Sequence, residues 1–291
     1  MVSTSRYTLR QLLGRQMDGE NTIVGTPDTG SGTDLAKARF GVSKLVPYSD
    51  DYFNDWHGRF YDGGHRDTDF EVTDFSSTDG IIHFSPALSE AVKTEDLFEL
   101  YQNYTPAELN DAINLAISIV ERDALQDKID ESIRLTESTY EYDIPSGFVY
   151  IEALYQESGT TGLYSQSDIE ARGMPATTGL RSLLGGRIDE RHWGNIPGPK
   201  IWFDPNGFGP TNNRQLRIVG QQVQPQLTKD SDLCTVSQAY IMYQAKALLH
   251  QSRIRGVGAD FEGHERQMTL SQIAADRERS RIHIAARGQA V

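Results

Sequence analysis

The spacing of hydrophobic positions changes several times along this chain of 291 residues. Residues 4–16 have a ragged apolar face at helical spacing, whereas residues 19–101 mostly alternate between polar and apolar positions. A glycine pair at Gly63–Gly64 marks a tight turn within the alternating region. Short strands joined by glycine turns are typical of a small sandwich or barrel. We therefore expect a short helix, an edge strand at Thr22–Thr26, and then an all-β block.

The clearest element is a helix predicted within residues 104–125. Thr105 and Glu108 have the spacing of a capping box, and Pro106 suits the first helical position. Apolar residues follow at i, i+3, i+4, i+7, i+8 and i+11, which places them on one stripe. We expect this stripe to be the subunit-packing face of the helix. Its main members are Leu109, Ile113, Ile117 and Val120.

A second β section follows this helix. The stretch Tyr140–Ile151 reads as two strands that are broken at Pro145–Gly147, and we expect the break to let a long strand leave the helical core and return. Residues 157–198 are rich in glycine and predict a long loop. Helices are then predicted over residues 235–252 and 261–286, and the second has only a weak apolar stripe.

These elements predict an α+β protein with a helical-bundle core, a β-sheet section and an inserted small all-β domain of the sandwich or barrel type. The expected core comprises residues 1–18 and 102–291. The expected inserted domain comprises residues 19–101.

The charge of the chain is −13, and residues 50–99 alone carry 13 acidic and 3 basic side chains. This balance argues against general nucleic-acid binding, because phosphate contacts need cationic surface. It is compatible with DNA that passes nearby without binding. No apolar run approaches the roughly 18 residues of a membrane helix, and no secretory signal is recognisable. The single cysteine, Cys234, excludes an internal disulfide and fits folding in a reducing cytoplasm.

Acidic residues on one predicted strand face allow two interpretations, a cation site and a solvated surface. Phe70 and Val72 should face inward, which turns the intervening polar residues outward. This outward group consists of His65, Asp67, Asp69 and Glu71. Their oxygen atoms could hold a divalent cation, or the face could be a solvated acidic surface. The solvated surface is favoured, because calcium sites usually need a loop that wraps around the ion.

No motif for catalysis is recognisable. The chain contains no G-x-S-x-G elbow, no phosphate-binding loop and no G-x-G-x-x-G run. Cys234 precedes an apolar helix, which favours a buried thiol or one near a helix cap. A pair of carboxylates for glycoside hydrolysis can always be named among 41 acidic residues, so it carries little weight. We expect neither enzymatic activity nor a metal or cofactor.

The C-terminal region is rich in arginine and allows two interpretations. It contains Arg266, Arg277, Arg279, Arg281 and Arg287. The helix could be exposed and laced with ion pairs to nearby acidic residues. Alternatively, it could be an arm that docks on an acidic partner surface, because a helix with a weak stripe is only marginally stable alone.

Several strings in the second half of the chain are similar to head-to-tail adaptor proteins of tailed bacteriophages. They are "YEYDIPSGFVYIEALY", "HWGN", "KIWFDP", "RQLRIVGQQVQPQLTKDSDL" and "AYIMYQAKALLHQ". In that family an N-terminal helix and a helix like "TPAELNDAINLAISIV" flank a variable region, and a Leu-Thr-x-Asp-x-Asp run enters the last helical pair. The acidic block resembles small β domains that are common in phage virion proteins.

The resemblance implies a structural virion protein in the neck of a tailed phage, assembled in the host cytoplasm. It implies a ring, commonly of twelve subunits, that lies below the portal protein and continues the DNA channel. Neighbouring adaptor subunits, the portal and tail, nozzle or other neck proteins are the expected partners, without a membrane and without specific DNA binding. A tail or baseplate component is an alternative. A glycan-binding virion module is another, with Trp56, Phe60 and Tyr61 as a stacking platform.

The C-terminal helix is the segment expected to dock on the portal. The expected docking residues are Arg266, Met268, Ile273, Arg277, Arg281, Ile282 and Ile284. We expect deletion of residues 261–291 to leave the fold intact and to abolish portal attachment.

Overall fold

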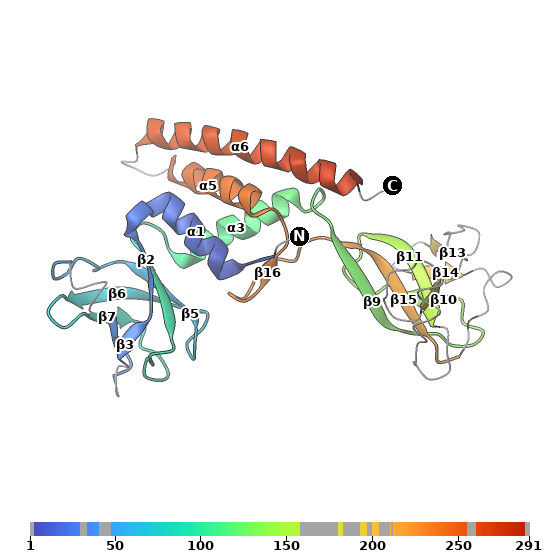
Figure 1. The fold of residues 1–291 in the computed structure, drawn as a ribbon, viewed down its shortest axis with the longest axis horizontal. Coiled ribbons are helices and arrows are strands. Elements are labelled where there is room, and N and C mark those ends of the chain that lie inside the picture. Colours follow the sequence, from blue (N-terminus) through green and yellow to red (C-terminus); the bar gives the residue numbers. More distant parts are fainter. Residues whose placement is uncertain are drawn as a thin grey trace. The chain divides into compact units, whose positions relative to one another are not determined.

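The computed structural model divides the chain into two compact units, coloured by sequence in Figure 1. One unit comprises Met1–Ala124 and Gln224–Val291, and the other comprises Leu125–Val223. The residues that the structure describes are 3–29, 34–40, 48–157, 180–182, 193–196, 200–203, 210, 212–254 and 260–288. Helices and antiparallel sheets together confirm the predicted α+β class.

Helices form the core of the first unit. They are α1 (Arg6–Asp18), the short 3-10 helix η1 (Gly19–Asn21), α3 (Pro106–Val120), α5 (Gln238–Ile254) and α6 (Phe261–Gly288). At the start of α3 the Oγ1 atom of Thr105 accepts a hydrogen bond from the N–H of Glu108 at 3.1 Å. The Oε2 atom of Glu108 in turn accepts one from the N–H of Thr105 at 2.9 Å, which confirms the predicted capping box.

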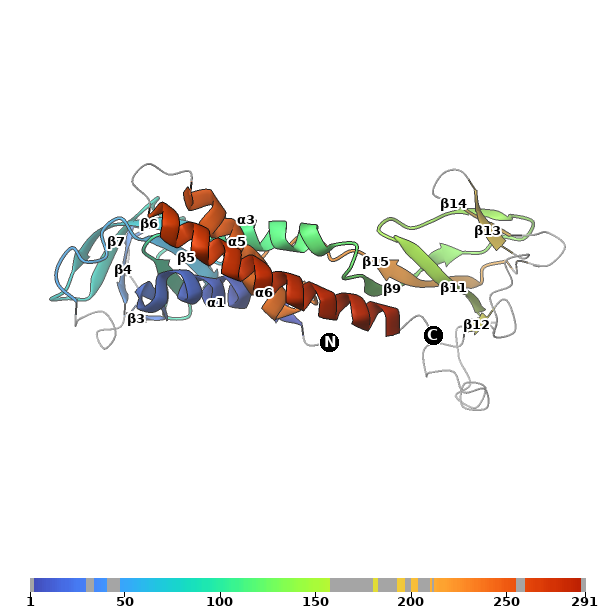
Figure 2. The same cartoon turned by 90° about the horizontal axis from the view of Figure 1, so that it is seen from above.

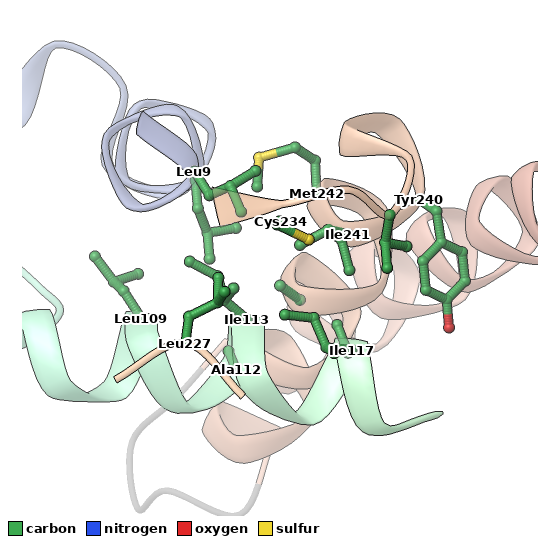
Figure 3. Close-up of a cluster of buried hydrophobic side chains, with 14 of the residues drawn as sticks. Leu9, Leu109, Ala112, Ile113, Ile117, Leu227, Cys234, Tyr240, Ile241 and Met242 are labelled. Carbon is green, nitrogen blue, oxygen red and sulfur yellow. The ribbon is translucent and has the colours of Figure 1, made fainter. Parts of the chain in front are cut away.

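The apolar stripe of α3 lies in the centre of this helical core. Leu109, Ile113, Ile117 and Val120 are each no more than 1% exposed. They pack with residues of α1 and α5, among which Figure 3 labels Leu9, Ile241 and Met242. α5 contacts α6, α3 and α1, and in Figure 1 it lies between α6 and the other two. Burial of this stripe therefore holds three helices together.

A seven-stranded antiparallel sheet completes the first unit, in the order β2-β8-β5-β6-β7-β4-β3. The strands are β2 (Thr22–Gly25), β3 (Pro27–Thr29), β4 (Lys37–Phe40), β5 (His57–Asp62), β6 (Thr68–Ser76), β7 (Ile81–Ser85) and β8 (Leu97–Tyr101). β2 is the edge strand predicted at Thr22–Thr26. Phe70 and Val72 are buried as predicted, in an apolar cluster of the sheet's own. The sheet nevertheless belongs to the same compact unit as the helices, so a separate domain at residues 19–101 stays a prediction.

A two-stranded ribbon ties the N-terminus to the segment before α5. β1 (Thr4–Ser5) pairs with β16 (Leu233–Cys234), with Thr4 opposite Cys234. Cys234 is buried, and its burial raises the pKa of the thiol to about 11. The prediction of a buried, unreactive cysteine is confirmed for this environment.

The second unit consists of two antiparallel sheets around a small apolar cluster. One sheet has the order β12-β11-β15-β9 and the other has the order β10-β14-β13. The strands are β9 (Gln126–Arg134), β10 (Glu141–Asp143), β11 (Tyr150–Glu157), β12 (Leu180–Ser182), β13 (Trp193–Ile196), β14 (Lys200–Phe203) and β15 (Gln215–Gln222). The cluster between them includes Leu154, Phe203 and Leu216. Most of the predicted long loop at 157–198 lies outside the described residues.

The break at Pro145–Gly147 has a different role from the one that the sequence predicted. β10 and β11 lie in different sheets of the second unit, and the break carries the chain from one sheet to the other. Pro145 cannot donate a hydrogen bond to a strand partner, and Gly147 has a φ of 92°, which favours glycine. The break therefore builds a two-layered unit rather than returning a strand to the helical core.

Candidate functional site

One buried carboxylate lies where the helices and the seven-stranded sheet of the first unit meet. Asp230 is fully buried, in the segment between β15 and β16. Its Oδ1 atom accepts hydrogen bonds from Nη2 of Arg6 at 2.9 Å and from Nη1 of Arg10 at 2.6 Å. Its Oδ2 atom accepts one from Nε of Arg59 at 2.7 Å and one from Nη2 of Arg10 at 3.1 Å. Three guanidinium groups thus converge on a single carboxylate, and we call this group the Asp230 cluster.

Further carboxylates balance the three cations of the Asp230 cluster. Glu99, fully buried on β8, accepts a hydrogen bond from Nε of Arg10. Arg59 donates to Asp67 at 2.9 Å and to Asp69 at 2.6 Å. Buried charges are tolerated only when they are paired and hydrogen-bonded, and here the three guanidinium groups face four carboxylates.

The electrostatics of the cluster keep Asp230 ionised. Burial disfavours the charged carboxylate, but hydrogen bonds and charge from Arg10 and Arg59 outweigh it and lower the pKa of Asp230 to about 2. Burial also opposes the charge of Arg10, yet Glu99 and Asp230 raise the pKa of its guanidinium above the ordinary value. At neutral pH the pairing of Asp230 with Arg10 and Arg59 is therefore a permanent electrostatic link rather than a titrating site.

The cluster joins segments that are far apart in the sequence. Arg6 and Arg10 lie one helical turn apart on α1, so they present guanidinium groups on the same side. The N–H groups of Arg6 and Tyr7, which have no partner within the first turn of α1, donate to the carbonyl oxygens of Asp232 at 2.9 Å and Asp230 at 3.3 Å. The N–H of Asp230 donates to Oδ1 of Asp67 at 2.9 Å. Side chains and backbone together fix α1 and the sheet to this segment.

The run Leu227–Asp232, hereafter the Asp230 loop, is held at both ends. Asn114 of α3 donates to the carbonyl of Leu227 at 3.1 Å and accepts from its N–H at 2.9 Å. Oδ2 of Asp232 accepts from the N–H groups of Thr228 at 2.7 Å and Lys229 at 2.8 Å. This is the Leu-Thr-x-Asp-x-Asp run on which part of the phage adaptor resemblance rests.

The structure corrects the interpretation of the acidic strand face. Asp67 and Asp69 pair with arginines of the Asp230 cluster, and are neither simply solvated nor placed around an ion. His65 is buried, with its Nε2 atom 3.9 Å from Oδ2 of Asp96. Asp69 and Glu71 are exposed as expected of a solvated face, although Asp69 also pairs with Arg59. Among the residues that the structure describes, no three His, Cys, Asp or Glu side chains are grouped as a metal site would require.

The C-terminal helix α6 packs against its own chain. Ser271 and Ala275 are buried, and Gln272 exchanges hydrogen bonds with Gln244 of α5 at 3.2 and 3.3 Å. Arg279 pairs with Asp123, just after α3, at 2.6 Å. Deletion of residues 261–291 would therefore expose a face of α5, which argues against the expectation that the fold would remain intact. The weak apolar stripe of α6 is sufficient to hold the helix on α5 because polar pairs such as Gln244–Gln272 add to the interface between them.

The docking residues predicted on α6 lie on different sides of the helix. Arg266, Ile273, Arg277 and Arg281 are exposed. Met268 is partly buried, Ile282 packs against the helical core, and the side chain of Ile284 is outside the described residues. Leu270, which sequence reasoning missed, is 52% exposed beside Ile273 at 47%. Leu270 precedes Ile273 by three residues, and this helical spacing could have identified it as a member of the same face.

Each of the two interpretations of the arginine-rich helix, ion pairing and availability to a partner, holds for some of its arginines. Arg279 pairs with Asp123, and Arg281 pairs with Glu278 at 2.5 Å. In contrast, neither Arg266 nor Arg277 forms an ion pair with any residue in the described part of the chain. Arg279 thus fixes the helix to the segment after α3, Arg281 pairs within the helix itself, and Arg266 and Arg277 remain available to a partner.

The predicted subunit-packing residues of α3 are all buried within their own chain, and a contact of these residues with another subunit stays untested. The opposite side of the same helix exposes Leu115 at 50% and Ile119 at 39%. The proposed glycan platform is wrong. Trp56 is 3% exposed and Phe60 is fully buried in the sheet core, and Tyr61 stacks on Tyr7 with ring centroids 5.1 Å apart.

Comparison with known proteins agrees with the Asp230 loop and the last helical pair. A family model described as SU10 adaptor protein matches residues 87–289. The match covers more than half of the 291 residues and contains β8, α3, the second unit, the Asp230 loop, α5 and α6. No curated protein matches the chain. None of the described helices is long and apolar enough to cross a membrane.

Proposed function

We propose that this chain, which belongs to the SU10 adaptor protein family, is a head-to-tail adaptor. Its copies would form a ring below the portal of a tailed phage. The ring would continue the DNA channel and offer a platform to tail proteins. The observation that carries this proposal is the family match over α3, the second unit, the Asp230 loop and the last two helices.

The charge of the chain supports a conduit role. With 41 acidic and 28 basic residues, the surface repels a polyanion more than it attracts one. DNA passes through a channel most freely when the channel surface lacks cationic side chains that bind phosphate. The proposal therefore includes DNA as cargo and excludes sequence-specific DNA binding.

The architecture of the first unit supports a role in transmitting force. The Asp230 cluster connects α1, β5, β8 and the Asp230 loop through ion pairs that are almost entirely dry. Breaking any one pair would leave a buried charge without a partner, which is costly. A subunit that transmits force between a head and a tail benefits from such a rigid junction.

The end of α6 is the proposed portal-docking element. Figures 1 and 2 show α6 running past the start of α5. The contacts Gln244–Gln272 and Asp123–Arg279 place that point close to Arg279, and Ile282 packs on the core just beyond it. A helix end that runs past the helix on which it packs gains stability from contact with another surface. We assign this end, rather than the whole helix, to the portal.

A truncation tests this assignment. Wild-type protein and a variant that lacks residues 283–291 would each be mixed with purified portal and separated by sedimentation. The wild type should co-sediment with the portal, whereas the truncated protein should remain folded by circular dichroism and stay in the light fraction.

A matched control is Val149→Ser in the second unit, where the native side chain is 59% exposed. This control should bind the portal like the wild type. Equal portal binding by the truncated and wild-type proteins would disprove the docking role of the helix end. Absence of binding by the wild type would count against the adaptor proposal itself.

A further inference from the structure

The outer side of α6 carries a stripe that its own chain leaves uncovered. Leu270 and Ile273 are 52% and 47% exposed, and Arg266 and Arg277 flank them at intervals of four residues. These spacings place the four side chains on one face of the helix. The buried residues Ser271 and Ala275 lie on the other face, against α5. We call this exposed face the α6 stripe.

A second uncovered stripe lies on α3. Leu115 and Ile119 are 50% and 39% exposed, and Asp111 is exposed one turn before Leu115. Within the described residues Asp111 has no hydrogen-bond or ion-pair partner. This face, the α3 stripe, points away from the buried stripe that packs on α1 and α5.

The two stripes lie on different sides of the helical layer. α5 packs against α6 through Gln244 and against α3 through the core around Ile241 and Ala245. In Figure 1, α6 lies on one side of α5 and α3 lies on the other. A ring built from one type of subunit needs two different surfaces of this kind, because each copy meets its two neighbours through opposite faces.

We propose that the α6 stripe of one copy packs on the α3 stripe of the next copy, so that the partner of both surfaces is this chain itself. The inference rests on the proposed ring and gives it an interface. Each stripe supplies two aliphatic side chains, and the buried area would come mainly from these four. Such pairs are the kind of exposed apolar surface that marks an interaction site.

Charge supports this choice of partner. Asp111 on the α3 stripe would meet one of the unpaired cations of the α6 stripe, Arg277 if the helices run antiparallel or Arg266 if they run parallel. Arg122 is exposed just after the end of α3 and carries the opposite charge to Asp111. The attraction between the two stripes is therefore expected at the Asp111 end of α3. Asp111 of the α3 stripe therefore complements the unpaired arginines of the α6 stripe, whereas two copies of the basic α6 stripe would repel each other.

Disulfide cross-linking tests the contact on the assembled protein. In the variant Leu115→Cys/Ile273→Cys, mild oxidation of portal-bound protein should give a ladder of covalent multimers in non-reducing electrophoresis. The native Cys234 is buried and unreactive, so it need not be removed. Leu115→Cys alone and Leu115→Cys/Val149→Cys serve as controls and should give no ladder beyond a dimer.

Charge reversal provides a second, independent measurement. Asp111→Arg should lower the amount of ring bound to portal about tenfold or more, because like charges would meet at a contact. Combination with either Arg277→Glu or Arg266→Glu should restore assembly, and the variant that restores it reports the direction of the helices. All three positions are exposed, so folding should be unaffected.

The outcomes separate the interface from the function. Portal-bound assemblies that form normally, without a cross-linked ladder and without an effect of Asp111→Arg, would overturn the interface and leave the adaptor function standing. Failure of the wild-type protein to assemble on portal at all would reject the proposed function and the interface together.

Discussion

The arginines of the Asp230 cluster and those of the α6 stripe make opposite use of the same side chain. Arg6, Arg10 and Arg59 are no more than 6% exposed, and each donates to at least two carboxylates. Arg266 and Arg277 are exposed and form no ion pair with the described residues. The difference indicates that the first group fixes the subunit internally and that the second remains available for assembly.

The largest expected effect is the loss of the central carboxylate. Asp230→Asn keeps the shape of the side chain but leaves three guanidinium groups around a neutral amide. We expect a loss of about 3–5 kcal/mol in the free energy of unfolding, because buried cations lose their shared partner. Urea denaturation followed by circular dichroism would measure it. The exposed Asp79→Asn should change stability by less than about 0.5 kcal/mol, and similar values for both variants would refute the central role of Asp230.

The next effect is a dependence of stability on pH that arises between α5 and α6. The Nδ1 atoms of His250 and His264 are 2.9 Å apart. Burial of His250, together with His264 and Lys246, lowers the pKa of His250 from 6.5 to about 4. As the pH falls from 6.5 to 4, the unfolded chain binds a proton that the folded chain does not. Stability should therefore decrease by up to about 3 kcal/mol over this window and change little from this group below it.

The variant His250→Gln should lose this pH dependence, whereas His83→Gln, on a strand of the seven-stranded sheet, should retain it. The contribution of Asp230 to stability can be separated from that of His250 by its pH range. Because the pKa of Asp230 is lowered, the stability that it adds is present above its ordinary pKa of 3.8 and is lost as the pH falls towards 2. Thermal unfolding from pH 7 to pH 3 would distinguish the two. A wild-type profile that is flat between pH 6.5 and 4 would contradict the buried His250.

A smaller effect distinguishes the two faces of α6. Ile282 packs against the helical core and Ile273 is 47% exposed, so the same truncation to alanine should have different costs. We expect Ile282→Ala to lower the free energy of unfolding by about 1–2 kcal/mol and Ile273→Ala to change it by less than about 0.5 kcal/mol. Equal costs, measured by urea denaturation, would show that the assignment of the faces is wrong.

The smallest effect on stability is expected for an arginine of the α6 stripe. Arg277→Ala removes no ion pair of the described chain, so the free energy of unfolding should stay within about 0.5 kcal/mol of the wild type. Matched measurements on Arg59→Ala should instead show a loss of several kcal/mol, because its three carboxylate partners would lose a buried cation. A large loss for Arg277→Ala would mean that this arginine supports the fold.

Local features could be predicted from the sequence, and long-range pairs could not. The capping box at Thr105 and the stripe beginning at Leu109 depend on neighbours within a few residues, and both are present as predicted. The ion pair between Arg10 and Asp230 joins residues 220 positions apart. Charge patterns alone do not reveal which arginine meets which carboxylate, and 41 acidic residues leave too many combinations.

The same limit applies to the candidate docking surface. The spacing of Arg266, Ile273 and Arg277 allowed their selection, but the sequence could not show that Ile282 of the same helix packs on the chain's own core and that Met268 is partly buried. That distinction depends on the pairing of α6 with α5, which side chains such as Gln244 and Gln272 determine through tertiary contacts. Polar pairs of this kind do not contribute to a hydrophobic stripe, so the apolar pattern alone underestimates how extensively α6 packs on its own chain.

The most direct test of the account is the mass of the protein, determined by native mass spectrometry, alone and after mixing with the portal. The account predicts that mixing gives a ring-sized complex, in which the portal holds multiple copies of the 32.5 kDa chain. A spectrum in which the mixture contains only free portal and free single chains would contradict the assignment as a head-to-tail adaptor.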